Sequence, residues 1–146
     1  MKIISHRGYE NGEDPSLENN PEQIIKLLGT NIDVEIDVSY DKTFYLGHDK
    51  PLHEVGLDFL KQDGLWCHAK NIEALKIMLR NNIHCFWHES DKYTITSKGY
   101  VWVYPGMPLC EGSVYVLPER YPIADRQNYK DCYAVCTDFP LKYLKE

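Results

Sequence analysis

The sequence contains no long apolar run. Apolar residues make up 43% of the 146, but they never form the stretch of roughly 18 that is needed to cross a bilayer. The first residues, Met1 to His6, also lack the apolar segment of a secretory signal peptide. We therefore expect a protein without stable membrane insertion, and we predict a cytoplasmic location.

Positive charge and paired cysteines are also scarce. The 16 Lys and Arg residues against 22 Asp and Glu give a net charge of −6, which argues against a nucleic-acid partner. The five cysteines are odd in number and lie mostly in apolar stretches, so reduced thiols are expected rather than a disulfide framework. No second cysteine pair matches Cys132 and Cys136, which disfavours a zinc ribbon. A Gly-rich nucleotide loop is missing too, which disfavours a nucleotide-dependent kinase.

The length and the order of the patterns indicate an α/β fold. The chain fits one domain, residues 1–146, but is short for a complete barrel enzyme of roughly 250 residues. A strand over residues 2–5, a helix from Pro21 to Gly29 and a strand from residue 33 predict a βαβ unit with parallel strands. A brief helix at Val55–Lys61, a strand at 65–70 and a helix at 72–80 repeat the pattern. After a fourth strand at 84–89, we expect strands joined by loops at Tyr93–Thr96, Tyr100–Tyr104, Ser113–Leu117 and Tyr133–Cys136. We predict a (β/α) barrel of the TIM type, trimmed so that its C-terminal half has few helices.

The most informative stretch runs from Asp33 to Asp49. Successive side chains of a strand alternate between its faces, so Glu35 and Asp37 are expected on one face and their apolar neighbours on the other. Two carboxylates buried together repel each other unless a cation lies between them. A bound divalent metal ion is the simplest explanation.

Ionisable residues gather at the ends of four successive predicted strands. They are His6 and Arg7, Glu35 and Asp37, His68 and Lys70, and His88 and Glu89. Ligands of parallel α/β proteins bind at the carboxyl ends of the strands, so we expect these groups to converge on one site.

The mixture of groups favours phosphoryl chemistry. Carboxylates suit a hard cation such as Mg²⁺ or Ca²⁺, and Arg7 and Lys70 suit an anionic phosphate. Two imidazoles, His6 and His48, can act as a base that activates a hydroxyl and an acid that protonates the leaving oxygen. Together they indicate phosphoryl transfer or cleavage of a small phosphodiester.

Five short motifs occur in order along the chain: His6-Arg7-Gly8, Glu18-Asn19, Glu35-Ile36-Asp37, His48-Asp49 and Thr137-Asp138-Phe139-Pro140. This ordered set resembles the glycerophosphodiester phosphodiesterase family, part of the phospholipase C-like phosphodiesterases. The resemblance implies a barrel hydrolase of lipid metabolism that uses one divalent cation, Mg²⁺ or Ca²⁺. It makes His6 and His48 the acid/base pair, Arg7 and Lys70 phosphate contacts, Glu35 and Asp37 metal ligands, and Glu18 and Asn19 supporting residues.

One departure from the family leaves the metal site open. The family usually has Glu-x-Lys on the third strand, whereas this chain has His68-Ala69-Lys70. Either His68 coordinates the ion, which would favour Mn²⁺ or Zn²⁺, or the ion is held more weakly with help from Glu89. We expect Asp138 to hold the closing strand in register, and a position at the mouth of the barrel is the alternative.

Two other functions remain open at this point. A catalytically degenerate barrel could bind a phosphorylated ligand without cleaving it, as His68 and the short chain suggest. A metal-dependent hydrolase of non-phosphate substrates would have little use for Arg7 and Lys70. The helix-poor second half would leave apolar surface that a second copy could cover, so a homodimer is a further alternative.

Overall fold

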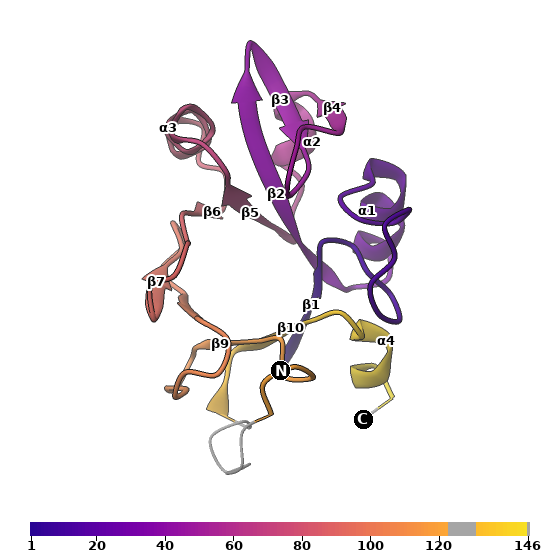
Figure 1. Cartoon of the computed structure of the whole chain (residues 1–146), viewed down its shortest axis with the longest axis vertical. Helices are drawn as coiled ribbons and strands as arrows, with labels where there is room; N and C mark the ends of the chain where they lie inside the picture. The colour runs from indigo at the N-terminus through magenta and orange to yellow at the C-terminus, as the bar shows by residue number, and fades with distance from the viewer. Residues whose placement is uncertain (123–130, 146) are drawn as a thin grey trace.

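The computed structural model describes residues 1–122 and 131–145 and has a mixed α/β fold (Figure 1). Four helices and ten strands follow one another along the described part of the chain. In order they are β1 (Lys2–His6), α1 (Pro21–Leu28), β2 (Asp33–Asp41), β3 (Thr43–Leu46), β4 (His53–Val55), α2 (Leu57–Leu60), β5 (Leu65–Ala69), α3 (Ile72–Arg80), β6 (Cys85–Phe86), β7 (Tyr93–Ile95), β8 (Val101–Val103), β9 (Val114–Val116), β10 (Ala134–Thr137) and α4 (Pro140–Tyr143).

All ten strands belong to one sheet, and most of its pairings are parallel. The parallel run is β8–β9–β10–β1–β2–β5–β6, so the first and last strands of the chain lie side by side. Antiparallel pairing adds β7 to β8 and the β3–β4 hairpin to β2. In Figure 1 the strands follow one another around a ring with α1, α3 and α4 on its outside.

The sheet is not closed by strand ladders. Within residues 1–122 and 131–145, no ladder joins β6 to β7 or β8. Hydrogen bonds of another kind cross this junction, because the Ser97 amide donates to the Cys85 carbonyl at 2.8 Å and the Cys85 amide donates to Ser97 Oγ at 2.9 Å. The expected α/β class and the scarcity of helices in the second half are confirmed for the described residues.

Local sequence signals explain the two longer helices. Pro21 occupies the first turn of α1, and the Asn20 side chain accepts from the Glu22 amide at 3.0 Å. In α3 the Asn71 side chain accepts from the Ala74 amide at 3.0 Å. Asn71 also exchanges hydrogen bonds with the backbone of Tyr40, so the cap ties α3 to the end of β2.

The expected helix at residues 72–80 and the four late strands are confirmed, and three details differ. The fourth strand is paired only over Cys85–Phe86, not over residues 84–89. The short helix is confined to Leu57–Leu60, because Val55 belongs to β4. The β3–β4 hairpin was not expected. None of the helices in the described ranges has the length and apolar character that crossing a bilayer requires.

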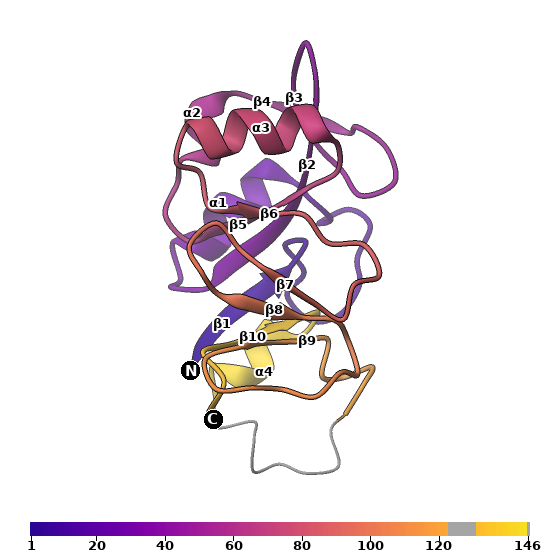
Figure 2. The ribbon, with the colours of Figure 1, turned by 90° about the vertical axis from the view of Figure 1, so that its left-hand side faces the viewer.

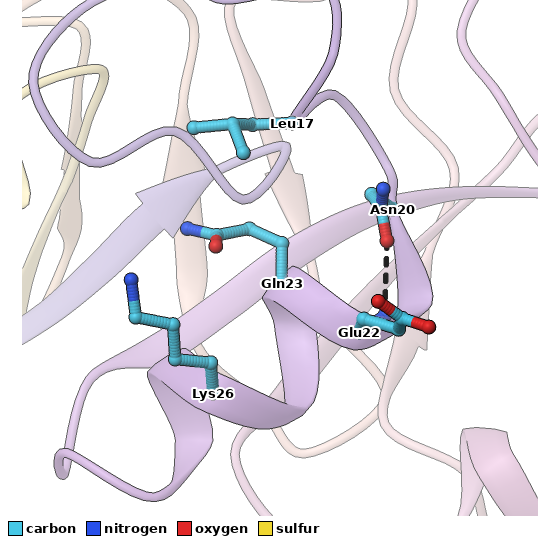
Figure 3. A pocket seen from close by; sticks show the side chains of 5 residues that line it. All are labelled: Leu17, Asn20, Glu22, Gln23 and Lys26. Carbon is cyan, nitrogen blue, oxygen red and sulfur yellow. Dashed lines mark hydrogen bonds between the residues drawn. The ribbon is translucent and has the colours of Figure 1, made fainter.

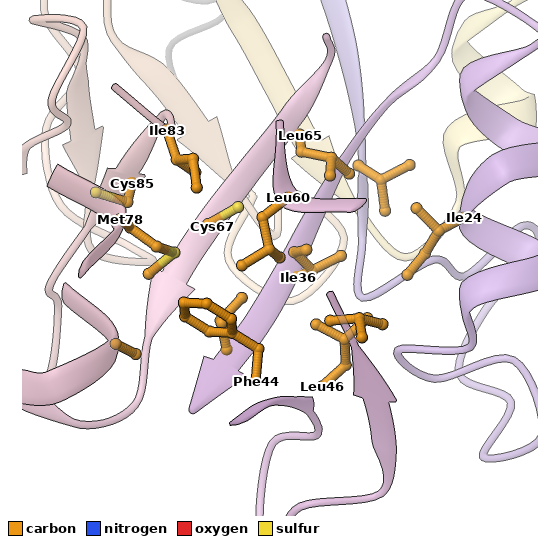
Figure 4. Packing of buried hydrophobic residues seen from close by; sticks show 14 of the residues in the cluster. Ile24, Ile36, Phe44, Leu46, Leu60, Leu65, Cys67, Met78, Ile83 and Cys85 are labelled. Atoms are coloured by element: carbon orange, nitrogen blue, oxygen red, sulfur yellow. The ribbon is translucent and has the colours of Figure 1, made fainter. Parts of the chain in front are cut away.

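Two hydrophobic clusters lie on opposite faces of the sheet. The larger one packs the outer face of β2 and β5 against the helices and includes Ile24, Ile36, Leu60, Cys67 and Met78 (Figure 4). The smaller one lies inside the ring and includes Ile4, Trp66, Phe86, Trp102 and Cys136. Figure 2 places α3 and the β3–β4 hairpin at one end of the molecule, and α4 and both termini toward the other.

His84, whose ring lies against Trp66 of the inner cluster, should make the stability of the protein depend on pH. Its Nε2 atom shares a hydrogen bond with Thr96 Oγ1 at 2.8 Å, and its ring lies 4.3 Å from that of Trp66. Burial, with a smaller contribution from the charge of Lys98, lowers the pKa of His84 to about 4. The folded protein therefore holds this imidazole neutral at a pH where the unfolded chain protonates it.

We predict that stability falls as the pH drops below the usual imidazole pKa. The contribution of a neutral His84 is fully present above about pH 6.5 and is lost toward pH 4, so the free energy of unfolding should fall by at most about 1 kcal/mol between pH 7 and pH 5.5. Urea unfolding at both pH values measures this change in the free energy of unfolding. His84→Gln should reduce the difference, whereas His53→Gln should leave it in place; an undiminished difference in the His84 variant would contradict the assignment.

Candidate functional site

Strand register brings the predicted residues to one face of the sheet. In the parallel ladders His6 is aligned with Glu35 across β1 and β2, and Asp37 with His68 across β2 and β5. Aligned residues of neighbouring strands point to the same side, and here that side is the inside of the ring. Glu35 and Asp37 therefore face away from Val34, Ile36 and Val38, which are buried in the outer cluster, as the alternation predicts.

The inner cluster forms an apolar floor beneath these polar groups. Two residues before His6 on β1 is Ile4, and two residues before His68 on β5 is Trp66; both are buried in that cluster. The carboxyl ends of three adjacent parallel strands thus carry the polar groups. The preceding inward positions are apolar on β1 and β5, whereas on β2 the position is Asp33, which accepts a hydrogen bond from Trp66 Nε1 at 2.9 Å. This arrangement shields the carboxylates from water on one side.

The two carboxylates are almost fully buried, with Glu35 2% and Asp37 1% exposed. Asn19, which is fully buried, brackets Asp37: its Nδ2 donates to Asp37 Oδ2 at 3.0 Å and its Oδ1 accepts from the Asp37 amide at 2.9 Å. The other oxygen of this carboxylate, Oδ1, is buried and accepts no hydrogen bond from any described residue. A buried carboxylate oxygen without a partner is costly, and a cation is the group that would satisfy it.

Arg7 lies beside both carboxylates. Its amide donates to the carbonyl and to Oε2 of Glu35 at 3.0 and 3.3 Å, and its Nη1 donates to Glu18 Oε1 at 2.9 Å. Its Nε lies 3.4 Å from Asp37 Oδ2 but makes no hydrogen bond within the described residues. Arg7 and Asn19 both have positive φ angles, and the Asn19 amide donates to the Arg7 carbonyl at 2.7 Å. This link joins two residues in left-handed conformations, which are uncommon for residues with a Cβ atom.

His68 faces the carboxylates through one ring nitrogen. Nδ1 lies 3.6 Å from Glu35 Oε1 and 3.5 Å from Asp37 Oδ1. The opposite nitrogen, Nε2, donates to the carbonyl of His88 at 2.7 Å. One ligand atom from each of Glu35, Asp37 and His68 can be chosen so that all three lie within 4.8 Å of one another. The group could therefore hold a metal ion.

His6 is oriented by a residue from the far end of the chain. Its Nδ1 lies 2.6 Å from Asp138 Oδ1, and its Nε2 lies 4.0 Å from Glu35 Oε2. The other oxygen of Asp138 accepts from Arg120 Nη2 at 2.7 Å, and Arg120 also pairs with Glu13. Asp138 thus lies at the site, which was the alternative to a register role, and Arg120 was not anticipated at all. The Thr137-Asp138 motif was a usable signal for the first, whereas no sequence pattern marked the second.

Three comparisons were made, with protein-family models, curated proteins and solved structures. None of them gave a match. The function of the chain therefore has to be argued from the geometry of this site.

The remaining predicted residues differ in how close they lie to the two carboxylates. Lys70 Nζ lies 3.8 Å from Asp37 Oδ1 and joins the site. His48 pairs with Asp49 at 2.8 Å in the loop after β3, where the Gly47 amide donates to the Asp37 carbonyl at 3.1 Å. A side chain at Gly47 would clash with the Lys50 carbonyl, so only glycine suits this turn. Glu89 is exposed, and no described contact brings it to the carboxylates, although the carbonyl of neighbouring His88 orients His68.

Electrostatics separate the two carboxylates. Burial acts to raise the pKa of Glu35, but the neighbouring His68, His6 and Arg7 lower it overall. Burial and the charge of Glu35 raise the pKa of Asp37. Although burial opposes it, hydrogen bonds from His6 and Arg120 lower the pKa of Asp138, so this group is a carboxylate that accepts a hydrogen bond from Nδ1–H of His6. The hydrogen bond from His48, with smaller effects from Arg7 and Lys70, lowers the pKa of Asp49.

A separate pocket lies on the surface beside α1 (Figure 3). It has a volume of about 340 Å³ and is lined by Leu17, Asn20, Glu22, Gln23 and Lys26. None of these residues is a member of the carboxylate and histidine group. The pocket is therefore not the candidate site.

The geometry predicts that Asp37 binds a metal ion and does not stabilise the metal-free fold. Asp37→Asn keeps the shape and the Asn19 contact but removes a charge that burial and Glu35 disfavour, so the metal-free variant should melt at or above the parent temperature. Divalent cations should stabilise the parent by up to about 3 kcal/mol at a hundred times the dissociation constant, and should not stabilise the variant.

Thermal melting with chelator and with added cation measures both effects. Asp58→Asn, which removes an exposed carboxylate from α2, is the control and should respond to cations like the parent. A metal-free Asp37→Asn protein that melts well below the parent would instead make Asp37 a structural partner of Arg7 and Lys70.

Proposed function

We propose that this chain is a metal-dependent phosphodiesterase of the glycerophosphodiester phosphodiesterase type that cleaves small phosphodiesters by acid/base catalysis. One observation carries the proposal: the buried Glu35 and Asp37 face the same space as His6, whose second ring nitrogen is fixed by Asp138. A structural ion-pair network has no need for an oriented basic nitrogen beside an unsatisfied carboxylate oxygen.

In this proposal His6 is the general base. Because Asp138 accepts a hydrogen bond from Nδ1–H and so keeps the proton on that nitrogen, Nε2 can take the proton of the attacking hydroxyl, from water or from a neighbouring alcohol of the substrate. The attacking oxygen then forms its bond to phosphorus as the bond to the leaving alcohol breaks. His48 protonates that leaving oxygen; it is one third exposed in a loop whose backbone contacts Asp37.

Positive groups complement the phosphoryl oxygens. Arg7 Nε, buried and without a hydrogen-bond partner among the described residues, and Lys70 Nζ are the donors available to them. A divalent cation held by Glu35, Asp37 and His68 would neutralise charge on the same oxygens. Glu18 and Asn19 support the arrangement by fixing Arg7 and Asp37.

The proposal also covers the fold of the chain. We infer that the open sheet is a trimmed (β/α) barrel. In support, the Ser97 and Cys85 hydrogen bonds bridge the gap between β6 and the turn after β7, and the polar groups lie at the carboxyl ends of parallel strands, as ligand sites of such barrels do.

The direct test is a small panel of phosphodiesters, including glycerophosphocholine and bis(4-nitrophenyl) phosphate, assayed with and without chelator. We expect hydrolysis that stops on chelation and returns with one added divalent ion. His6→Gln should lower kcat by about 10²–10⁴-fold, because the proton acceptor is lost. Binding of phosphodiesters without any turnover would favour a catalytically degenerate barrel instead.

Asp138 should act through His6 rather than on the substrate. Asp138→Asn keeps the size of the side chain but removes the charge that holds the Nδ1 proton, so we expect kcat to fall roughly 10- to 100-fold while KM changes little. Nitrogen chemical shifts of His6 measure the tautomer directly, and they should show the proton on Nδ1 in the parent and a shift toward Nε2 in the variant. An unchanged tautomer would contradict this role.

A further inference from the structure

We infer that Nδ1 of His68 is the third protein ligand of the metal site, and that the site therefore prefers a first-row transition ion such as Mn²⁺ or Co²⁺ over Mg²⁺ and Ca²⁺. The inference rests on the metal site of the proposed function and deepens it. The hard cations expected from the carboxylates alone are the alternative.

The ring of His68 is fixed before any ion binds. It stacks on Phe86 with 5.0 Å between the ring centres and 13° between the planes, and Nε2 lies 2.7 Å from the His88 carbonyl oxygen. A carbonyl oxygen can only accept, so Nε2 carries a proton, and Nδ1 is the nitrogen whose lone pair can bind a cation. Histidines that ligate metals are typically oriented by this kind of hydrogen bond on the other nitrogen.

That lone pair faces two carboxylates. Nδ1 lies 3.5 Å from Asp37 Oδ1, the oxygen without a hydrogen-bond partner, and 3.6 Å from Glu35 Oε1. Three electron-rich atoms this close repel one another unless a cation lies among them. Ligands bound at about 2.0–2.2 Å to one small ion are separated by roughly 3.0–3.5 Å, so the two distances from Nδ1 are close to those between ligands of one ion.

The charges around the site disfavour a hard ion. Ca²⁺ needs six to eight oxygen ligands, and Mg²⁺ is bound through carboxylates and water. Here a neutral nitrogen stands in the third position, and Arg7 and Lys70 already lie within 4 Å of Asp37. The net negative charge available to an ion is therefore small, whereas a nitrogen ligand strengthens binding of transition ions.

Titration of the metal-free chain with each ion tests the preference. Calorimetry should give at least 10-fold tighter binding of Mn²⁺ and Co²⁺ than of Mg²⁺ and Ca²⁺. His68→Glu replaces the nitrogen by a carboxylate and should narrow or reverse the difference. Zn²⁺ is left out because the exposed Cys110 thiol offers it another ligand.

Pulsed electron paramagnetic resonance on the Mn²⁺-loaded protein identifies the ligand. We expect a directly bound ¹⁴N nucleus in the parent, no such signal in His68→Gln, and an unchanged signal in His53→Gln, which removes an imidazole from β4. A nitrogen signal that survives His68→Gln would overturn the assignment.

Failure of this inference can be told apart from failure of the proposed function. Mg²⁺ binding as tight as Mn²⁺ binding, together with Mg²⁺-dependent phosphodiester hydrolysis, would overturn the ion preference and leave the phosphodiesterase standing. Absence of binding by all four ions would overturn the inference directly, and the proposed metal-dependent reaction with it.

Discussion

The burial of two carboxylates on one face of β2 is the constraint around which the site is built. Glu35 and Asp37 are almost fully shielded from water, and the preceding positions on the neighbouring strands form an apolar floor. Like charges in such a place are tolerated only when positive groups or strong donors surround them. Four residues meet this need: they are Arg7 through its backbone amide and side chain, Asn19 through its side-chain amide, His68 through its ring and Lys70 through its amine.

Satisfying the pair requires unusual backbone. Arg7 and Asn19 both adopt left-handed conformations, which cost energy for residues with a Cβ atom. Their conformations are coupled, because the amide of one donates to the carbonyl of the other. Even so, one oxygen of Asp37 remains without a hydrogen bond among the described residues. Strain together with an unsatisfied acceptor is typical of a binding site rather than of a network optimised for stability.

Short-range patterns predicted the half of the site that lies on adjacent strands. Alternation along residues 33–38 was enough to place Glu35 and Asp37 on one face, and the strand-end rule was enough to bring His6 and Lys70 toward them. His68 remained ambiguous, because its role depends on which nitrogen faces the carboxylates. The His88 carbonyl decides that orientation, and no residue identity encodes a carbonyl direction. Glu89 was predicted to help hold the ion in case His68 does not coordinate it. The exposed side chain of Glu89 makes no described contact with the site.

Long-range strand pairing accounts for the contacts of the site that the sequence patterns did not specify. Asp138 contacts His6 across 132 positions, and it can do so only because β10 pairs in parallel with β1. Arg120, which precedes β10, donates a hydrogen bond to the same Asp138 carboxylate. The helix-poor second half thus supplies the partner that orients His6, and through Trp102 and Cys136 it supplies part of the apolar floor. A short chain can dispense with outer helices in this half, because the inward-facing residues of its strands are the ones that the site requires.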